Sequence, residues 1–156
     1  MASNGNVNFR DLENFRRRLE ENLSGNQVDL FIESCAKELA ARLLAKVIKR
    51  TPVGQYPKSS GKKGGTLRRG WTNGKNQAAS AYANGLKVNH FGDTFVIEII
   101  NPVEYASYVE FGHRTRNHQG WVEGKFMLTI SEQEIESDAP RILENKLKKK
   151  LGECFK

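Results

Sequence analysis

The chain has 156 residues, of which 38% are hydrophobic and 28% charged, and its formal net charge is +7. This composition excludes a disordered chain, and the length predicts a single domain, residues 1–156, with a hydrophobic core. No stretch approaches about eighteen apolar residues and no apolar segment follows the N-terminus, so we expect neither a membrane span nor a secretory signal.

The first part of the chain has the periodicity of helices. Apolar residues recur at steps of three and four within residues 1–25 and again over 28–50, and each pattern predicts an amphipathic helix, the second one long. Thr51 and Pro52 end the second helix, because the residue before a proline avoids helical geometry. Residues 52–70 are rich in glycine and lysine, and they predict a flexible basic loop.

The middle of the chain has the pattern of β-strands. Within residues 71–101, alternating and β-branched residues predict antiparallel strands, with a hairpin over 86–100 that turns at 91–93. A further strand, beginning at about Trp71 or lying around 78–82, is expected to complete the sheet.

The last part of the chain returns to helical patterns. Residues 102–112 predict a short helix, with Pro102 in its first turn and Gly112 as its stop. Residues 113–125 predict a second polar loop, and 126–151 a C-terminal helical region, either one kinked helix or two abutting helices. This order predicts an α+β fold: N-terminal helices, one of them long, and a C-terminal helix packed against a small antiparallel sheet, with two long flexible loops.

The sequence contains no recognisable catalytic or metal-binding arrangement. The glycine–lysine segment lacks the Ser or Thr of a phosphate-binding loop, and a helix rather than a strand precedes it. The histidines lack the one-turn spacing of a helical zinc site, and Glu104 and Glu110 would point in different directions on a helix. Cys35 and Cys154 lie far apart, which favours free thiols in a cytoplasmic compartment. We therefore predict no catalytic residue, no cofactor and no metal.

Two features allow both a functional and a structural interpretation. Residues 51–92 carry seven basic residues and no acidic one, which indicates either contact with phosphates or a solvated loop. Aromatic residues are frequent in the second half of the chain, and at helical spacing they favour a place in the core, the alternative being a protein–protein interface. These aromatic residues are Trp71, Tyr105, Tyr108, Phe111 and Trp121.

Four segments occur in an order that resembles one protein family. They are T-P-V-G at 51–54, T-L-R-R-G-W at 66–71, N-P-V-E-Y-A-S-Y-V-E-F-G-H at 101–113 and G-K-F-M at 124–127. This order resembles the tail-component or neck proteins of tailed bacteriophages, the gene-product-ten-like family, over about residues 28–150. The chain departs from that family at Gly54, where an aspartate is usual, and in a longer loop before the arginine pair.

The resemblance implies a structural virion protein without enzymatic activity. It implies a neck or tail-completion protein that joins the head connector to the tail, commonly as a hexameric ring around the DNA channel. Its expected partners are the head connector or adaptor, the tail terminator or tail tube, other copies of itself, and genomic DNA if the basic loop faces the channel. Its expected location is the virion, after assembly in the cytoplasm of the bacterial host. The competing interpretation is a small basic DNA-binding protein of bacterial or prophage origin, without sequence specificity.

Two sets of residues are expected to carry these roles. The two loops are expected to contact partner subunits or channel DNA through Lys58, Lys62, Lys63, Arg68, Arg69, Arg114, Arg116, His118 and Trp121. The structural positions of the motif are Trp71, Tyr105, Tyr108, Glu110, Phe111, Gly112 and Phe126. We expect the block from Tyr105 to Gly112 to pack the short helix onto the hairpin, so that Tyr105→Ala and Tyr108→Ala destabilise the monomer.

Overall fold

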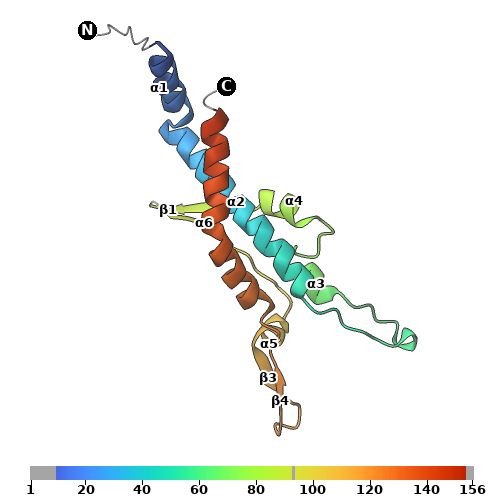
Figure 1. Cartoon of the computed structure of the whole chain (residues 1–156). Helices are drawn as coiled ribbons and strands as arrows, with labels where there is room; N and C mark the ends of the chain where they lie inside the picture. The colour runs from blue at the N-terminus through green and yellow to red at the C-terminus, as the bar shows by residue number, and fades with distance from the viewer. Residues whose placement is uncertain (1–9, 93, 154–156) are drawn as a thin grey trace, which may run out of the picture.

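Two long antiparallel helices form the axis of an elongated molecule (Figure 1). The computed structural model describes residues 10–92 and 94–153. Helix α2 (Gly25–Arg50) packs along helix α6 (Met127–Glu153), and α1 (Arg10–Asn22) continues past the N-terminal end of α2. The helices expected within 1–25 and over 28–50 are therefore present, although the first nine residues lie outside the described part.

Helix α6 is one continuous helix through Pro140. A proline inside a helix removes one backbone hydrogen bond and usually kinks or ends it. Here Ile135 and Ile142 are both buried, one on each side of Pro140. Because both halves of α6 bury side chains, packing holds the helix together across the missing bond. Of the two expected forms of this region, two abutting helices are excluded.

The strands form two separate antiparallel hairpins. Strand β1 (Val88–Phe91) pairs with β2 (Thr94–Ile97), within the region where the sequence predicts a hairpin. Strand β3 (Gly112–Arg114) pairs with β4 (Trp121–Glu123), so the segment expected to be a polar loop is largely a hairpin arm.

The prediction of an additional strand near Trp71 or around 78–82 is wrong, because both places are at or beside short helices. Trp71 follows the short helix α3 (Thr66–Gly70), and α4 (Ala79–Asn84) occupies the second position. Alanine is the strongest helix former, and it recurs through α4. Ala83 is fully buried in the core, so both local preference and packing favour a helix there.

The short helix α5 (Ala106–Phe111) begins later than expected. Pro102 lies before the helix rather than in its first turn, because the Asn101 side chain accepts a hydrogen bond from the backbone N–H of Val103 (3.1 Å) and fixes a turn there. Gly112 does end the helix, with a φ of +86° that favours glycine.

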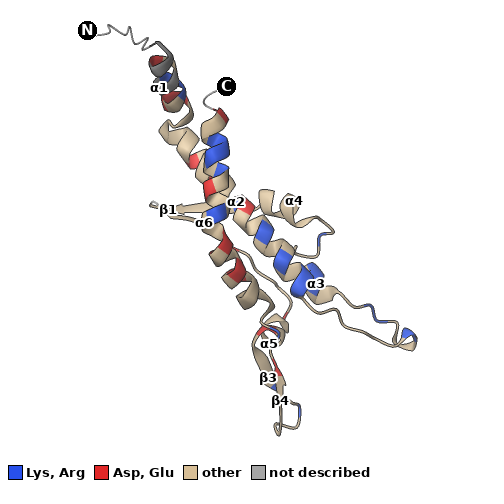
Figure 2. Cartoon of the chain, in the orientation of Figure 1, with Lys and Arg blue, Asp and Glu red and all other residues tan. Residues whose placement is uncertain are grey.

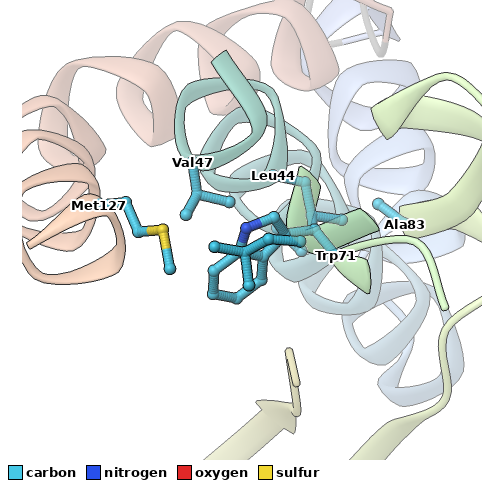
Figure 3. Close-up of a cluster of buried hydrophobic side chains, with 7 residues drawn as sticks. Leu44, Val47, Trp71, Ala83 and Met127 are labelled. Atoms are coloured by element: carbon cyan, nitrogen blue, oxygen red, sulfur yellow. The ribbon is translucent and has the colours of Figure 1, made fainter. Parts of the chain in front are cut away.

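The core lies where α2, α3, α4 and the start of α6 meet (Figure 3). Leu44 and Val47 of α2 are fully buried, and Trp71 and Met127 close the cluster from two sides. The α+β class, with one long N-terminal helix, a C-terminal helix and small antiparallel strand pairs, is confirmed.

Ion pairs join α2 to α6 along their seam. Lys146 donates to Glu38 at 2.8 Å, and Arg50 and Lys46 donate to Glu134 at 2.7 and 3.0 Å. The hydrogen bond from Lys146 lowers the pKa of Glu38, and the hydrogen bonds from Arg50 and Lys46 lower the pKa of Glu134. Both carboxylates therefore favour the folded state in their charged form.

Cys35 is a buried free cysteine of α2, and its burial raises the pKa of the thiol. Cys154 lies outside the described residues, so its expected state stays a prediction. Among the helices of residues 10–92 and 94–153, none has the length and hydropathy needed to cross a membrane.

Candidate interaction surface

Thr51, at the end of α2, joins the long helix to the core. Its hydroxyl donates to the carbonyl of Val47 (2.6 Å) and accepts from the indole N–H of Trp71 (2.7 Å). Its carbonyl accepts from the guanidinium of Arg68 at 2.7 Å. Thr51 is completely buried, and every polar atom is used, so the T-P-V segment has a structural role.

The two arginines of the first loop set differ from its lysines. Arg68 is half-buried and bonds the carbonyl of Thr51, which satisfies an unpaired group at the end of α2. Arg69 is exposed and makes long hydrogen bonds to Gly64 (3.4 Å) and Thr66 (3.5 Å). The guanidinium of Arg68 is therefore engaged within the chain, and its expected partner contact stays a prediction.

Asn101 fastens the segment before α5 to α3. Its amide donates to the carbonyl of Leu67 at 2.8 Å. A side chain at Gly70 would collide with Asn101, so glycine is needed for this close approach. These contacts place the start of the N-P-V-E-Y segment against the core.

Glu110 is buried and caps the N-terminus of α6. Its two carboxylate oxygens accept from the backbone N–H groups of Leu128 (2.9 Å) and Thr129 (2.8 Å), and from the Thr129 hydroxyl (2.7 Å). The first N–H groups of a helix have no partner within the helix, and a negative charge there also interacts favourably with the helix dipole. Glu110 therefore ties α5 to α6.

The β3–β4 arm is fixed at its base by backbone contacts. Gly112 has a φ of +86°, and a side chain there would strike the backbone of Val122 and Gly124. The N–H groups of Lys125 and Phe126 bond the carbonyls of Val109 (2.7 Å) and Glu110 (3.0 Å). The arm and α5 consequently share one rigid base.

Five aromatic side chains in and around this base are exposed. The exposed fractions are 44% for Tyr105, 59% for Tyr108, 61% for Phe111, 55% for Trp121 and 39% for Phe126. Phe111 and Phe126 make an edge-to-face contact at 6.4 Å between ring centroids. We call these five residues the aromatic face.

Within the block from Tyr105 to Gly112, which we expected to pack the short helix onto the hairpin, the aromatic side chains are exposed rather than packed inward. Helix α5 is only six residues long, and its inner side is filled by Glu110 together with Ala106 and Val109, which pack on the core. Residues three positions apart share a helix face, so the aromatic residues are left on the outer side.

The basic loop over 52–65 projects from the end of α2, away from the body (Figure 2). Lys58, Lys62 and Lys63 are all exposed, and Lys58 begins a short 3-10 turn that ends at Ser60. The Lys62 ammonium lies 5.9 Å from the centroid of the Tyr56 ring, itself half exposed. The loop thus presents three cations and an aromatic ring to solvent.

The second loop set lies at the tip of the β3–β4 arm. Arg114 pairs with Trp121 across the two strands, and Arg116 and His118 lie in the exposed turn between them. The Thr115 side chain stabilises this turn through a hydrogen bond from the N–H of Gly120 at 3.0 Å. The structure therefore brings the Trp121 indole close to Gly112 at the end of α5. Lys63 of the first loop set lines one pocket together with Tyr105, so the base of the basic loop adjoins the aromatic face.

Within the described residues, no group of three or more His, Cys, Asp or Glu side chains could hold a metal ion. Sequence reasoning missed Thr51, Asn101 and the cap made by Glu110. For Glu110 no local signal exists, because its partners lie eighteen and nineteen positions later in the chain.

Comparison with known proteins agrees with the resemblance in the motif. A family model described as "Bacteriophage HK97-gp10, putative tail-component" matches residues 13–112, which include α2 to α5 and the T-P-V, arginine-pair and Y-A-S-Y-V-E-F-G segments. Searches of curated proteins and of solved structures gave no match. The match covers more than half of the chain, and the protein therefore belongs to the HK97-gp10-like family of bacteriophage tail components.

Proposed function

We propose that this protein is a structural neck or tail-completion protein that joins the head connector to the tail at the head–tail junction. In this proposal the chain works as a hexameric ring around the DNA channel and has no enzymatic activity. Membership of a phage tail-component family supports a place in the virion and partners among phage structural proteins. The finer assignment depends on the surface described above.

The observation that carries the proposal is the exposed aromatic face. Tyr, Trp and Phe are enriched in protein–protein interfaces, where they bury large areas and lose few rotamers. Here Tyr108 and Phe111 each expose more than half of their surface, although α5 is held rigidly by the Glu110 cap. A rigid base with exposed aromatic anchors is suited to bind a partner with little ordering cost.

Two elements, the β3–β4 arm and the basic loop, extend the interaction surface away from the body of the molecule. The β3–β4 arm extends beyond α5 and carries the exposed Trp121, and the basic loop extends from between α2 and α3 (Figure 1). Two arms that leave a compact helix pair suit a subunit that contacts neighbours on several sides. Heterologous contacts of this kind close into rings when the rotation between copies allows it.

The test removes the aromatic anchors without touching the core. Tyr108→Ala and Phe111→Ala should leave the melting temperature within a few degrees of wild type, because exposed substitutions cost less than about 1 kcal/mol. In a host that lacks the wild-type gene, we expect these variants to yield separate heads and tails, while an epitope-tagged wild-type protein is located by gold labelling at the junction.

A matched control is Phe91→Ala, which removes a similarly exposed aromatic residue from the end of strand β1. This control should yield joined particles at the wild-type level. The proposal would be refuted by wild-type yields of joined particles from the α5 variants, or by intact particles whose accessible tag lies elsewhere than the junction.

One observation favours the competing function, a small DNA-binding protein without sequence specificity. Lys58, Lys62 and Lys63 are exposed in a region without acidic residues, which suits phosphate contact. That function predicts a stable complex with duplex DNA at physiological salt and an affinity that falls steeply as the salt concentration rises. Filter binding of the protein to duplex DNA across a series of salt concentrations tests this function. If no complex forms, the DNA-binding function is excluded.

A further inference from the structure

The three lysines of the basic loop have no anionic partner among the residues that the structure describes. Lys58, Lys62 and Lys63 form no ion pair within residues 10–92 and 94–153, and the whole segment 51–92 contains no acidic residue. Like charges held on one loop repel each other, and a nearby anion relieves that repulsion. The loop therefore presents positive charge that an anionic surface from outside would complement.

A complementary pair of charges lies on α6. Glu132 and Glu136 are exposed, and they are separated by one helical turn, so they share a face. Like charges at this spacing destabilise a helix slightly. In the described part of the chain neither carboxylate forms an ion pair, whereas Glu134 between them turns toward α2 and is neutralised by Arg50.

The two surfaces lie on opposite sides of the molecule. In Figure 2 the basic loop extends from the end of α2 in one direction, and the acidic half of α6 lies on the other side of α2. The loop over 52–65 runs out and back, so each side has about seven residues. When extended, about seven residues reach roughly 23 Å, which is long enough to contact a neighbouring subunit. A head-to-tail contact between two copies would bring one copy's loop to the next copy's helix face.

We propose that the loop over 52–65 of one copy docks on the Glu132 and Glu136 face of α6 in the next copy. Lys58, Lys62 and Lys63 pair with the two carboxylates, and the exposed ring of Tyr56 covers the contact. This inference rests on the proposed ring and names the contact between its subunits. A second copy is favoured over DNA because it neutralises both unpaired clusters at once, whereas DNA would leave the two carboxylates unpaired.

The first test is zero-length cross-linking of purified phage particles with a carbodiimide. This reagent joins a lysine amine to a carboxylate only when they are in contact. We expect a covalent dimer in which a peptide with Lys58, Lys62 or Lys63 is joined to one with Glu132 or Glu136. If the protein is present in the particles but these lysines are joined to another protein or to none, the proposed contact is refuted and the head–tail role remains. Particles without the protein overturn the role itself.

The second test exchanges the charges. Lys58, Lys62 and Lys63 are changed to Glu in one variant, and Glu132→Lys and Glu136→Lys are made in another. Each variant alone should lower the yield of joined particles about tenfold or more, because opposite charges now repel across every contact. Combining both changes in one chain restores opposite charges at each contact, so the yield should return to within about threefold of wild type.

A control lowers the net charge by four units, against six for the loop variant, and leaves the contact intact. Lys75→Glu and Lys87→Glu alter exposed lysines outside the loop, and they should not reduce the yield. The contact is refuted if the combined variant assembles no better than the worse single variant while circular dichroism shows it folded. Loss of packaged DNA from joined particles of the loop variant, with normal incorporation, would assign the loop to DNA instead.

Discussion

Replacing Glu110 should destabilise the fold more than replacing any other acidic residue of the motif. The Glu110→Ala change removes the acceptor of two backbone N–H groups and of the Thr129 hydroxyl at the start of α6. Loss of a helix cap costs about 1–2 kcal/mol, and partly buried donors left unpaired add about 1–2 kcal/mol. We therefore expect the free energy of unfolding to fall by about 3 kcal/mol.

The measurement is urea unfolding followed by far-ultraviolet circular dichroism. With a slope of about 2 kcal/mol per molar urea, the loss lowers the midpoint by about 1.5 M. Glu110→Gln keeps one acceptor oxygen and the shape of the side chain, so its midpoint should fall about half as far. Glu104→Ala is the control, because Glu104 is exposed on the same segment and should change stability by less than about 0.5 kcal/mol. Equal midpoints for Glu110→Ala and Glu104→Ala would refute the capping argument.

Two further predictions concern the core and the seam between α2 and α6. In a double-mutant cycle, Trp71→Phe and Thr51→Val should show a coupling of about 1 kcal/mol for their buried hydrogen bond, and additive effects would contradict it. The pKa values of Glu38 and Glu134 are lowered, so the folded state binds fewer protons than the unfolded state and stability falls as the pH drops below 4.5, the ordinary value of both groups. Replacing both residues with Gln should flatten the stability profile between about pH 5 and 3, and an unchanged slope would exclude their contribution.

The helical parts of the fold were predictable because their signal is local and repeated. Helix α2 carries apolar residues at regular steps over its length, and Thr51 and Pro52 mark its end within one residue. The segment that became α4 is short and contains polar residues on both sides of its alanines, so periodicity gave no direction. Its helical form depends on Ala83 reaching the core beside Leu44, which only the tertiary structure reveals.

The candidate site was predictable as a region but not residue by residue. The spacing of Tyr105, Tyr108 and Phe111 correctly places them on one side of a helix, and it cannot say which side faces the core. Glu110 determines which side of α5 faces the core, because its carboxylate accepts hydrogen bonds from the first N–H groups of α6. A buried charge is costly unless it is bonded, so its position is decided by a helix much later in the chain.

The same helix therefore connects stability with the proposed interface. Glu110 and Phe111 are neighbours in α5, one directed to α6 and the other to solvent. Because the cap holds the helix in place, the backbone position that carries the Phe111 ring is fixed. A Glu110→Gln variant that remains folded should then bind its partner more weakly, even though no interface side chain has changed. Normal assembly by such a variant would show that the aromatic face needs no rigid base.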